Sequence, residues 1–175
     1  MISVSNKENI SSLLKIFKKY KIKIISSGGT YRFIKKLGYN CTELSKYTGF
    51  KEMLDGRVKT LHPKIHAGIL HDRQNKTHKK QMSKQKFPSI DLIVVNFYPF
   101  QKVVTETKNP KKIIENIDIG GPTMVRAAAK NFKNVAIITN SKDYEPLINE
   151  LEQYKGKTSL KFREFMSSKA FGLTA

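Results

Sequence analysis

The chain has 175 residues, of which 39% are hydrophobic and 10% aromatic, enough apolar material for one domain with a buried core. This composition argues against a disordered chain, and no apolar run approaches the roughly 20 residues that a membrane-spanning helix requires. The 33 basic and 14 acidic residues leave a net charge of +19, which brings nucleic acid into consideration as a partner.

The distribution of the charge weakens that consideration. Lysine supplies most of the basic residues and is spread along the whole chain. The densest basic run, from Lys76 to Lys86, contains no acidic residue, but it also contains no Phe, Tyr or Trp that could stack on bases. A run of this kind is more typical of a solvated helix face. We therefore expect no nucleic-acid partner and no membrane association.

The cysteine content and the N-terminus indicate a cellular compartment. Cys41 is the single cysteine, so an intrachain disulfide is excluded, and we interpret Cys41 as a small buried side chain. The first residues lack the basic and long apolar regions of a signal peptide. Both features favour a cytoplasmic protein.

Hydrophobic periodicity predicts strands and helices that alternate along the chain. In the first half we expect a strand at 2–5, an amphipathic helix at 8–20, a strand at 22–26, a turn at 27–30 followed by a helix at 31–37, and a third strand at 40–44. A loop with one helical turn is expected next, at 45–62, then a strand at 67–70 and a polar helix at 72–86.

The second half continues the alternation. The clearest buried strand is 90–97, which is almost continuously apolar, as central parallel strands are. After it we expect a helix at 111–117, a helix at 123–131 with Pro122 at its first position, a strand at 134–139, a helix at 143–154 capped by Ser141, and a last helix capped by Ser159. The alternation predicts one α/β domain over residues 1–175, with a largely parallel sheet between layers of helices.

The turn Ser27-Gly28-Gly29-Thr30 is a candidate anion site because it lies between a predicted strand and a predicted helix. Its glycines permit close approach of the backbone, and the start of the helix offers free N–H groups. A plain tight turn is the alternative interpretation. Ligands of parallel sheets bind beyond the carboxyl ends of strands, so Ser3, Ser5 and Lys7 are expected to face the same phosphate.

Asp118, Gly120 and Gly121 form a second candidate site at the start of a helix. The two glycines expose N–H groups beside a carboxylate, an arrangement that can stabilise an oxyanion while Asp118 accepts a proton. An ordinary capped helix start is the alternative. Lys130, on the same helix after three alanines, has small apolar neighbours, which suggests a buried face where the pKa of a lysine is lowered.

Asn96 and Tyr98 end the central strand, where polar groups can point into a ligand crevice. We expect Phe97 and Phe100, in the same segment, to close the core.

The segment from Arg57 to Leu70 concentrates cations, a hydroxyl and two histidines, which suits a loop that presents charged groups to an anionic ligand. His62 and His66 have the i, i+4 spacing of a zinc motif. Pro63 lies between them, however, and no cysteine pair or carboxylate cluster accompanies them, so no metal site is predicted.

Taken in order along the chain, these segments resemble the IMP cyclohydrolase domain of the bifunctional AICAR formyltransferase/IMP cyclohydrolase family. The resemblance covers residues 2–175 and is carried by segments 3–7, 27–30, 48–50, 55–63, 96–100, 118–123 and 126–131. The segments around Arg57 and Asp118 are long and highly specific, whereas the others are distinctive through their order. The family usually has Asp where this chain has Asn6, at a peripheral position.

The resemblance implies a methylglyoxal-synthase-like fold, which is a three-layer α/β sandwich with a mostly parallel, Rossmann-like sheet. It implies a hydrolase acting on a cyclic amidine: IMP cyclohydrolase, which closes the ring of 5-formamidoimidazole-4-carboxamide ribotide (FAICAR) to inosine monophosphate with loss of water, the last step of de novo purine synthesis. It also implies a homodimer that uses neither metal nor cofactor. The formyltransferase domain of the family is absent from this chain, which is therefore not expected to make FAICAR itself.

The resemblance also implies roles for individual residues. The catalytic residues would be Lys59, Tyr98, Asp118 and Lys130. The phosphate and ribose would be held by Ser3, Ser5, Lys7, Ser27, Gly28, Gly29 and Thr30. Further substrate contacts would come from Arg57, Thr60, His62, Asn96, Gly120 and Gly121.

Two alternatives are open at this point. The first is another activity on a similar fold, as in methylglyoxal synthase or the allosteric domain of carbamoyl-phosphate synthetase. The carboxylate motifs of methylglyoxal synthase are not found here, and that activity does not account for segment 96–100. The second is a basic nucleic-acid binder without enzymatic activity.

Overall fold

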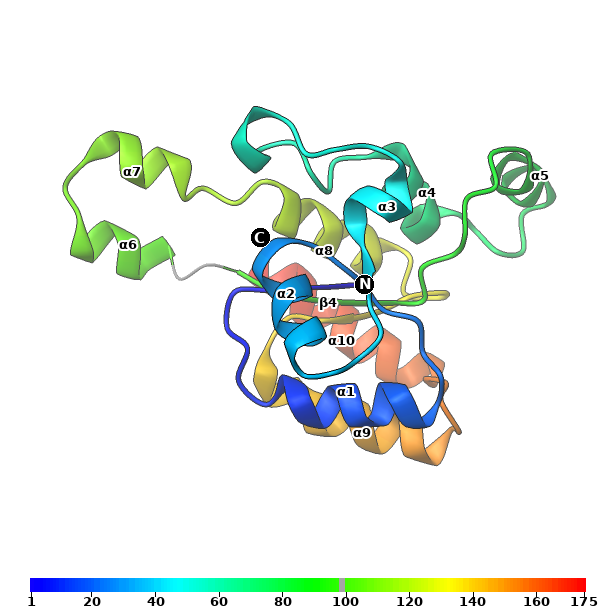
Figure 1. Ribbon diagram of the computed structural model, residues 1–175. Coiled ribbons are helices and arrows are strands. Elements are labelled where there is room, and N and C mark those ends of the chain that lie inside the picture. Colours follow the sequence, from blue (N-terminus) through cyan, green and yellow to red (C-terminus); the bar gives the residue numbers. More distant parts are fainter. Residues whose placement is uncertain (98–99) are drawn as a thin grey trace.

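A five-stranded parallel sheet lies at the centre of the protein, in a computed structural model that describes residues 1–97 and 100–175 (Figure 1). The strand order is β3-β2-β1-β4-β5. The strands are β1 (Ile2–Val4), β2 (Ile25–Ser26), β3 (Thr42–Glu43), β4 (Leu92–Asn96) and β5 (Ala136–Ile138). All four strand pairings are parallel, which confirms the predicted α/β class and the parallel sheet.

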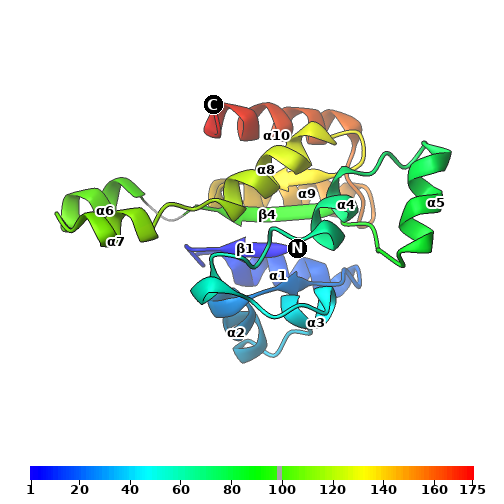
Figure 2. The ribbon, with the colours of Figure 1, turned by 90° about the horizontal axis from the view of Figure 1, so that it is seen from above.

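Helices cover both faces of the sheet. They are α1 (Ile10–Lys19), α2 (Gly28–Lys36), α3 (Leu44–Thr48), α4 (Pro63–Leu70), α5 (Lys76–Lys84), α6 (Phe100–Glu106), α7 (Pro110–Glu115), α8 (Gly120–Lys130), α9 (Tyr144–Gln153) and α10 (Leu160–Leu173), with 3-10 turns η1 (Leu54–Gly56) and η2 (Ser141–Asp143). Helices α1 and α9 pack together on one face, while α4 and α8 pack together on the other, and α10 contacts α8 and β5 (Figures 1 and 2). Within the described residues, no helix is long and apolar enough to span a bilayer.

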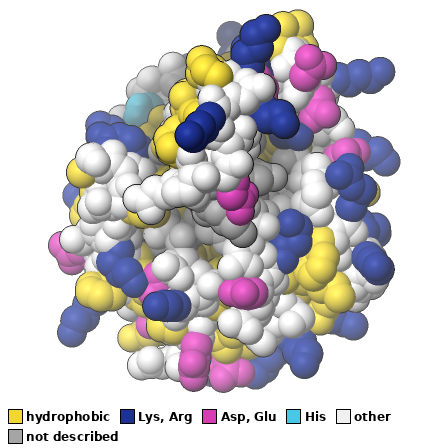
Figure 3. Space-filling view, turned by 90° about the vertical axis from the view of Figure 1, so that its left-hand side faces the viewer, with side chains coloured by type: hydrophobic (Ala, Val, Ile, Leu, Met, Phe, Trp, Pro, Cys, Tyr) yellow, Lys and Arg dark blue, Asp and Glu magenta, His cyan; other side chains and the backbone are white. Residues whose placement is uncertain are grey.

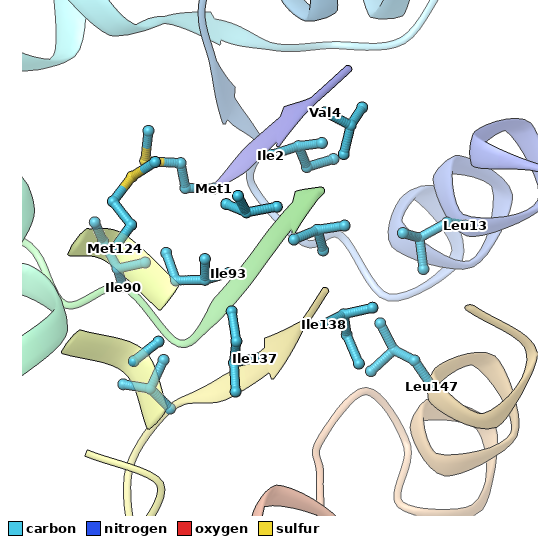
Figure 4. Packing of buried hydrophobic residues seen from close by; sticks show 14 of the residues in the cluster. Met1, Ile2, Val4, Leu13, Ile90, Ile93, Met124, Ile137, Ile138 and Leu147 are labelled. Atoms are coloured by element: carbon cyan, nitrogen blue, oxygen red, sulfur yellow. The ribbon is translucent and has the colours of Figure 1, made fainter. Parts of the chain in front are cut away.

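The core follows from the apolar periodicity of the sequence. Leu13 of α1 and Leu147 of α9 lie on one side of the strands, and Met124 of α8 lies on the other (Figure 4). The central strand β4 carries Ile93 and Val94, which are buried on opposite faces. A continuous apolar run therefore becomes a strand covered on both sides, as expected for a parallel sheet.

The strand order creates a crevice between β1 and β4. From β1 the chain moves outward through β2 to β3, whereas β4 returns to the other side of β1 and is followed by β5. The paired residues Val4 and Asn96 mark the carboxyl ends of the two neighbouring strands. Connections leave these two strands in opposite directions, and the space beyond the strand ends is where ligands of such sheets bind.

The prediction of a strand at 67–70 is wrong, because these residues belong to helix α4. Pro63 occupies the first turn of that helix, where its fixed φ favours the helical conformation. His62 caps it, with Nδ1 accepting a hydrogen bond from the Lys64 N–H at 3.1 Å. The local helix signals therefore outweigh the short apolar run that suggested a strand.

Smaller differences concern the ends of elements. The strand expected at 22–26 is reduced to Ile25 and Ser26, and helix α6 has no counterpart in the expectation. Helix α8 begins at Gly120, so Pro122 is its third residue, and Asn140 rather than Ser141 provides the side-chain cap before α9. The predicted cap of the last helix is confirmed, because the Ser159 hydroxyl accepts a hydrogen bond from the Phe162 N–H at 3.2 Å.

Helices α6 and α7 form an arm that projects from the body beyond the carboxyl ends of the strands (Figure 1, left). Figure 3 looks onto this side of the molecule. Lys and Arg side chains are scattered over it with Asp and Glu side chains among them, and they do not gather into a single basic patch (Figure 3). The net charge is therefore not focused on this face as it would be in a nucleic-acid groove.

The environment of Cys41 predicts low reactivity of its thiol. Burial raises the pKa of Cys41 to about 11, so the thiolate fraction near pH 8 falls about a hundredfold relative to a thiol at the usual value of 9.0. We expect the native protein to react with a disulfide reagent roughly two orders of magnitude more slowly than the urea-unfolded chain at the same pH. Equal rates in the two states, measured by stopped-flow absorbance, would contradict this.

Candidate active site

A cavity of about 690 Å³ opens where the carboxyl ends of β1 and β4 meet. Its walls come from these strand ends, the turn before α2, the loop at 55–60, segment 114–119 and the start of α8. This volume lies within the usual range for small-molecule sites. The predicted site residues that line it are Ser3, Ser5, Lys7, Ser27, Gly28, Gly29, Thr30, Arg57, Lys59, Thr60, Asn96, Asp118, Gly120 and Gly121.

The side chain of Asn96 joins the ends of the two central strands. Its Oδ1 accepts hydrogen bonds from the N–H groups of Ser5 at 2.6 Å and Asn6 at 3.0 Å, and its Nδ2 donates to the Asn6 carbonyl at 2.8 Å. Both the oxygen and the nitrogen of the amide thus bind the segment that follows β1. Asn96 was predicted as a substrate contact, and in this structure it fixes the floor of the cavity.

The turn before α2 combines a structural hydroxyl with an open one. Thr30 is buried, and its Oγ1 donates to the Val4 carbonyl at 2.9 Å and accepts from the Val4 N–H at 3.2 Å. These bonds fix the start of α2 against β1. Ser27 occupies the N-cap position, but its side chain makes no capping bond, so its hydroxyl is available to a ligand. Gly28 has φ +52°, a conformation that favours glycine.

The loop that carries Lys59 is a short antiparallel hairpin. Met53 and Val58 exchange two backbone hydrogen bonds, Met53 N–H to Val58 O at 3.0 Å and Val58 N–H to Met53 O at 3.2 Å. Leu54, Asp55 and Gly56, which form the turn, all have positive φ values. Two non-glycine residues in this region are uncommon, which marks a strained turn beside the cavity.

Two glycines of α8 allow its start to approach the rest of the site closely. A Cβ on Gly120 would overlap the hydroxyl of the buried Thr60, and a Cβ on Gly121 would overlap the Asp118 carboxylate. Asp118 Oδ1 accepts a hydrogen bond from the Gly121 N–H at 2.9 Å. This N–H was predicted to donate a hydrogen bond to a developing oxyanion, whereas in the structure it donates to Asp118 and orients that carboxylate.

The cations of the cavity differ in their partners. Lys7 Nζ donates to the Ser5 carbonyl at 3.1 Å, whereas Lys59 Nζ lies 2.5 Å from Glu52 Oε2. Arg57 donates to both carboxylate oxygens of Glu115 at the end of α7. The hydrogen bonds from Lys59 and Arg57 lower the pKa of the Glu52 and Glu115 carboxyls below their usual values.

The Arg57–Glu115 pair links the arm to the hairpin across the cavity. Both side chains are more than half exposed, so the pair contributes little stability. It is therefore better suited to being exchanged when an anionic ligand enters than to holding the fold together.

Three predicted site residues are not found in this lining. His62 caps α4, and its ring lies 5.9 Å from the Phe50 ring. These two contacts give His62 a structural role. Lys130 is exposed at the far end of α8, about 15 Å along the helix from Gly120 at 1.5 Å per residue. The neighbours of Lys130 suggested a buried face, and that expectation is wrong. Tyr98 lies outside the described residues.

Sequence reasoning missed the carboxylates that surround the cations. Asp55 and Glu115 line the cavity, and Glu52 holds Lys59 from outside the lining. Glu52 lies seven residues before Lys59, and the glycines at 49 and 56 signal turns on both sides of Met53. A hairpin reading of this segment would have placed Glu52 opposite Lys59. No local signal indicates that the arm returns Glu115 to Arg57.

Within residues 1–97 and 100–175, no group of three or more His, Cys, Asp or Glu side chains is arranged to hold a metal ion. His62 and His66 have separate structural environments, since the first caps α4 and the second is half-buried with no hydrogen-bond partner at its Nε2 among the described residues.

Comparison with known proteins identifies the family. A family model described as "MGS-like domain" matches residues 9–123, about two thirds of the chain. The chain belongs to the MGS-like domain family. The model of a second family, described as "AICARFT/IMPCHase bienzyme", matches residues 128–175. Together the two matches confirm the resemblance recognised from the ordered motifs.

Similar proteins extend this assignment. The bifunctional purine biosynthesis protein PurH of Clostridium perfringens (strain SM101 / Type A) is 47% identical over 173 residues, covering 99% of this chain and 34% of the relative. The protein of the same name from Persephonella marina (strain DSM 14350 / EX-H1) is 49% identical over 175 residues, covering 100% of this chain and 34% of the relative. The MGS-like chain thus spans about a third of the length of the curated relatives it matches.

A solved structure supports the fold over its full length. The structure titled "Crystal structure of ForH" superposes with a TM-score of 0.86 at 30% identity, covering 99% of this chain and 91% of that one. The likeness therefore supports the MGS-like fold over nearly the whole chain.

The packing of Gly120 against Thr60 predicts a stability effect of a single methyl group. In Gly120→Ala the new methyl group must displace the buried Thr60 hydroxyl. Because this overpacking outweighs the higher helix propensity of alanine, we expect the free energy of unfolding to fall by about 1 kcal/mol or more. Gly172→Ala in α10 has no atom within 4 Å of the new Cβ and is expected to be neutral or stabilising by up to about 1 kcal/mol. Urea unfolding measures both, and equal stabilities of the two variants would contradict the close approach.

Proposed function

We propose that this domain is an IMP cyclohydrolase, which closes FAICAR to inosine monophosphate with loss of water. The observation that carries the proposal is the convergence of the distant motifs on one cavity. The turn before α2 lies next to Lys59, since a Cβ on Gly28 would be 3.4 Å from Lys59 Nζ, and Thr60 lies against Gly120 beside Asp118. The similarity to purine biosynthesis proteins supports a purine ribotide as the substrate.

The proposed binding mode uses the two ends of the cavity. The phosphate would bind at the turn before α2, where the open Ser27 hydroxyl and the helix start lie in the same cavity as Lys7, whose ammonium donates to the Ser5 carbonyl. The reacting groups of the base would then lie near Lys59, Asp118 and the start of α8. The ribose would span the region of Ser3 and Ser5.

The proposed chemistry joins two groups of one substrate. The carboxamide nitrogen attacks the formyl carbon, a C–N bond forms, and the formyl oxygen leaves as water after proton transfer. Asp118, oriented by the Gly121 N–H, would accept or orient the amide proton, and Lys59 would stabilise the developing oxyanion or supply a proton. Because the step is intramolecular, positioning of the two groups supplies a large part of the acceleration. No metal or cofactor takes part in this scheme.

Two further residues stay predictions of the resemblance. Tyr98 would relay or orient protons, and Lys130 would contribute a second cation. Within one chain Lys130 is far from the cavity, so the proposal for the isolated domain depends on Lys59 and Asp118.

The function is tested with the purified domain and FAICAR in the presence of a metal chelator. We expect formation of inosine monophosphate, followed by its ultraviolet absorbance. Lys59→Ala and Asp118→Ala are expected to lower kcat by roughly 100-fold or more, because each removes a group that acts only in the transition state. Failure of the folded wild-type domain to convert FAICAR at high concentration would disprove the proposal. Full activity of both variants would disprove the residue assignment alone.

We also propose that the domain forms a homodimer, as the resemblance implies. The projecting arm and the segment after it expose large apolar side chains at Phe100, Val104, Ile114, Ile117 and Ile119, which a partner could cover. Light scattering at tens of micromolar protein is expected to give about twice the chain mass of 20.0 kDa. A mass of one chain under these conditions would contradict the dimer.

A further inference from the structure

The hairpin at 52–59 places one carboxylate directly opposite the proposed catalytic lysine. Met53 and Val58 form a hydrogen-bonded antiparallel pair through two backbone bonds. One step outward along this ladder, Glu52 faces Lys59, and side chains of directly opposite residues project from the same side of the two strands. The backbone register therefore sets the Glu52–Lys59 pairing before any ligand is present.

The side chains make the contact that this register allows. Glu52 Oε2 lies 2.5 Å from Lys59 Nζ. Lys59 lines the cavity and its side chain is 30% exposed, whereas Glu52 lies outside the lining and its side chain is 56% exposed. The ammonium thus faces the ligand space, while the carboxylate holds it from the solvent side.

Glycines leave room for this pair on two sides. A Cβ on Gly28 would lie 3.4 Å from Lys59 Nζ, and a Cβ on Gly56 would lie 3.9 Å from Glu52 Oε2 and 4.0 Å from Lys59 Nζ. The ammonium is therefore located between the carboxylate and the turn that opens α2. A lysine side chain has four rotatable bonds, and without a fixed partner it would sample many positions over a cavity of this width.

The second ion pair of the site has a different construction. Arg57 and Glu115 come from separate segments, the hairpin and the end of α7, so their contact depends on the position of the arm. Glu52 and Lys59 come from the same hairpin, and their contact does not depend on the arm. Glu52 is accordingly the partner that stays with its cation.

We propose that Glu52 is a positioning residue that holds the Lys59 ammonium at the reacting end of the cavity and acts only through Lys59. The inference deepens the proposed cyclohydrolase function and rests on it. Glu52 itself touches no substrate. Its removal leaves the cavity and its other walls unchanged but lets the ammonium leave the geometry that the reaction requires.

The test compares Glu52→Gln, which keeps the size of the side chain, with the wild-type domain. We expect kcat to fall about 10- to 100-fold while KM stays within about twofold, because misplacing a catalytic group affects the transition state more than ground-state binding. Glu52→Asp, which keeps the charge but shortens the reach, is expected to give an intermediate kcat. The urea unfolding midpoint is expected to match the wild type, since Glu52 is exposed.

Glu152→Gln is the matched control. Glu152, whose side chain is about as exposed as that of Glu52, forms an ion pair with Lys19 at 2.9 Å, between α9 and the end of α1 and away from the cavity. Its substitution is expected to leave both kcat and KM unchanged. A loss of activity that follows from breaking any surface ion pair would appear in this variant as well.

The double variant Glu52→Gln/Lys59→Ala decides whether Glu52 acts through Lys59. A positioning role predicts that Glu52→Gln has no further effect once Lys59 is alanine, so the double and the Lys59→Ala variants have equal single-turnover rates. A multiplicative loss, or a Glu52→Gln enzyme with wild-type kcat, overturns the positioning role while the cyclohydrolase function stands. A wild-type domain without turnover overturns the function and this role together.

Discussion

The site depends on the amide group of Asn96, which ties the end of β4 to the segment that follows β1. Three hydrogen bonds join its oxygen and its nitrogen to the backbone of Ser5 and Asn6. The bonds lie where the strand order changes direction, so they hold together the two strands whose connections diverge. Without this link the backbone of Ser5 and Asn6 would carry unpaired N–H groups at the floor of the cavity. The Asn96 amide therefore fixes the position of the residues that follow β1 relative to the end of β4.

Close packing at glycine positions places the other segments that line the cavity next to these strand ends. Gly120 accommodates Thr60, Gly121 accommodates Asp118, and Gly28 lies beside Lys59. The contacts of Gly120 with Thr60 and of Gly28 with Lys59 join segments that are far apart in the sequence, whereas Gly121 and Asp118 are three residues apart. A Cβ would overlap the neighbouring side chain at Gly120 and at Gly121, and the positive φ of Gly28 disfavours any other residue there. The glycines that looked like anion-binding turns thus have a second role, since they allow the charged side chains to reach one another.

The electrostatics of the site differ from those suggested by the net charge. A chain of +19 would be expected to present an open basic surface, but two of the cavity's cations, Arg57 and Lys59, are paired with Glu115 and Glu52. Lys7 donates to a carbonyl group and offers its charge to a ligand near the turn before α2. Local pairing, rather than overall composition, therefore governs where an anion can bind.

The amino-acid sequence by itself determined the α/β class, the buried central strand, the cap of the last helix and the family, because these follow from periodicity, local capping chemistry and ordered motifs. The motifs in the sequence also identified most of the residues that line the cavity. Only the tertiary structure decided that Asn96 links the ends of β1 and β4, that Thr30 fixes α2 against β1, that Lys130 lies away from the cavity, and that Glu115 pairs with Arg57. These features depend on contacts between segments distant along the chain, and local patterns carry no information about which side chains such contacts bring together.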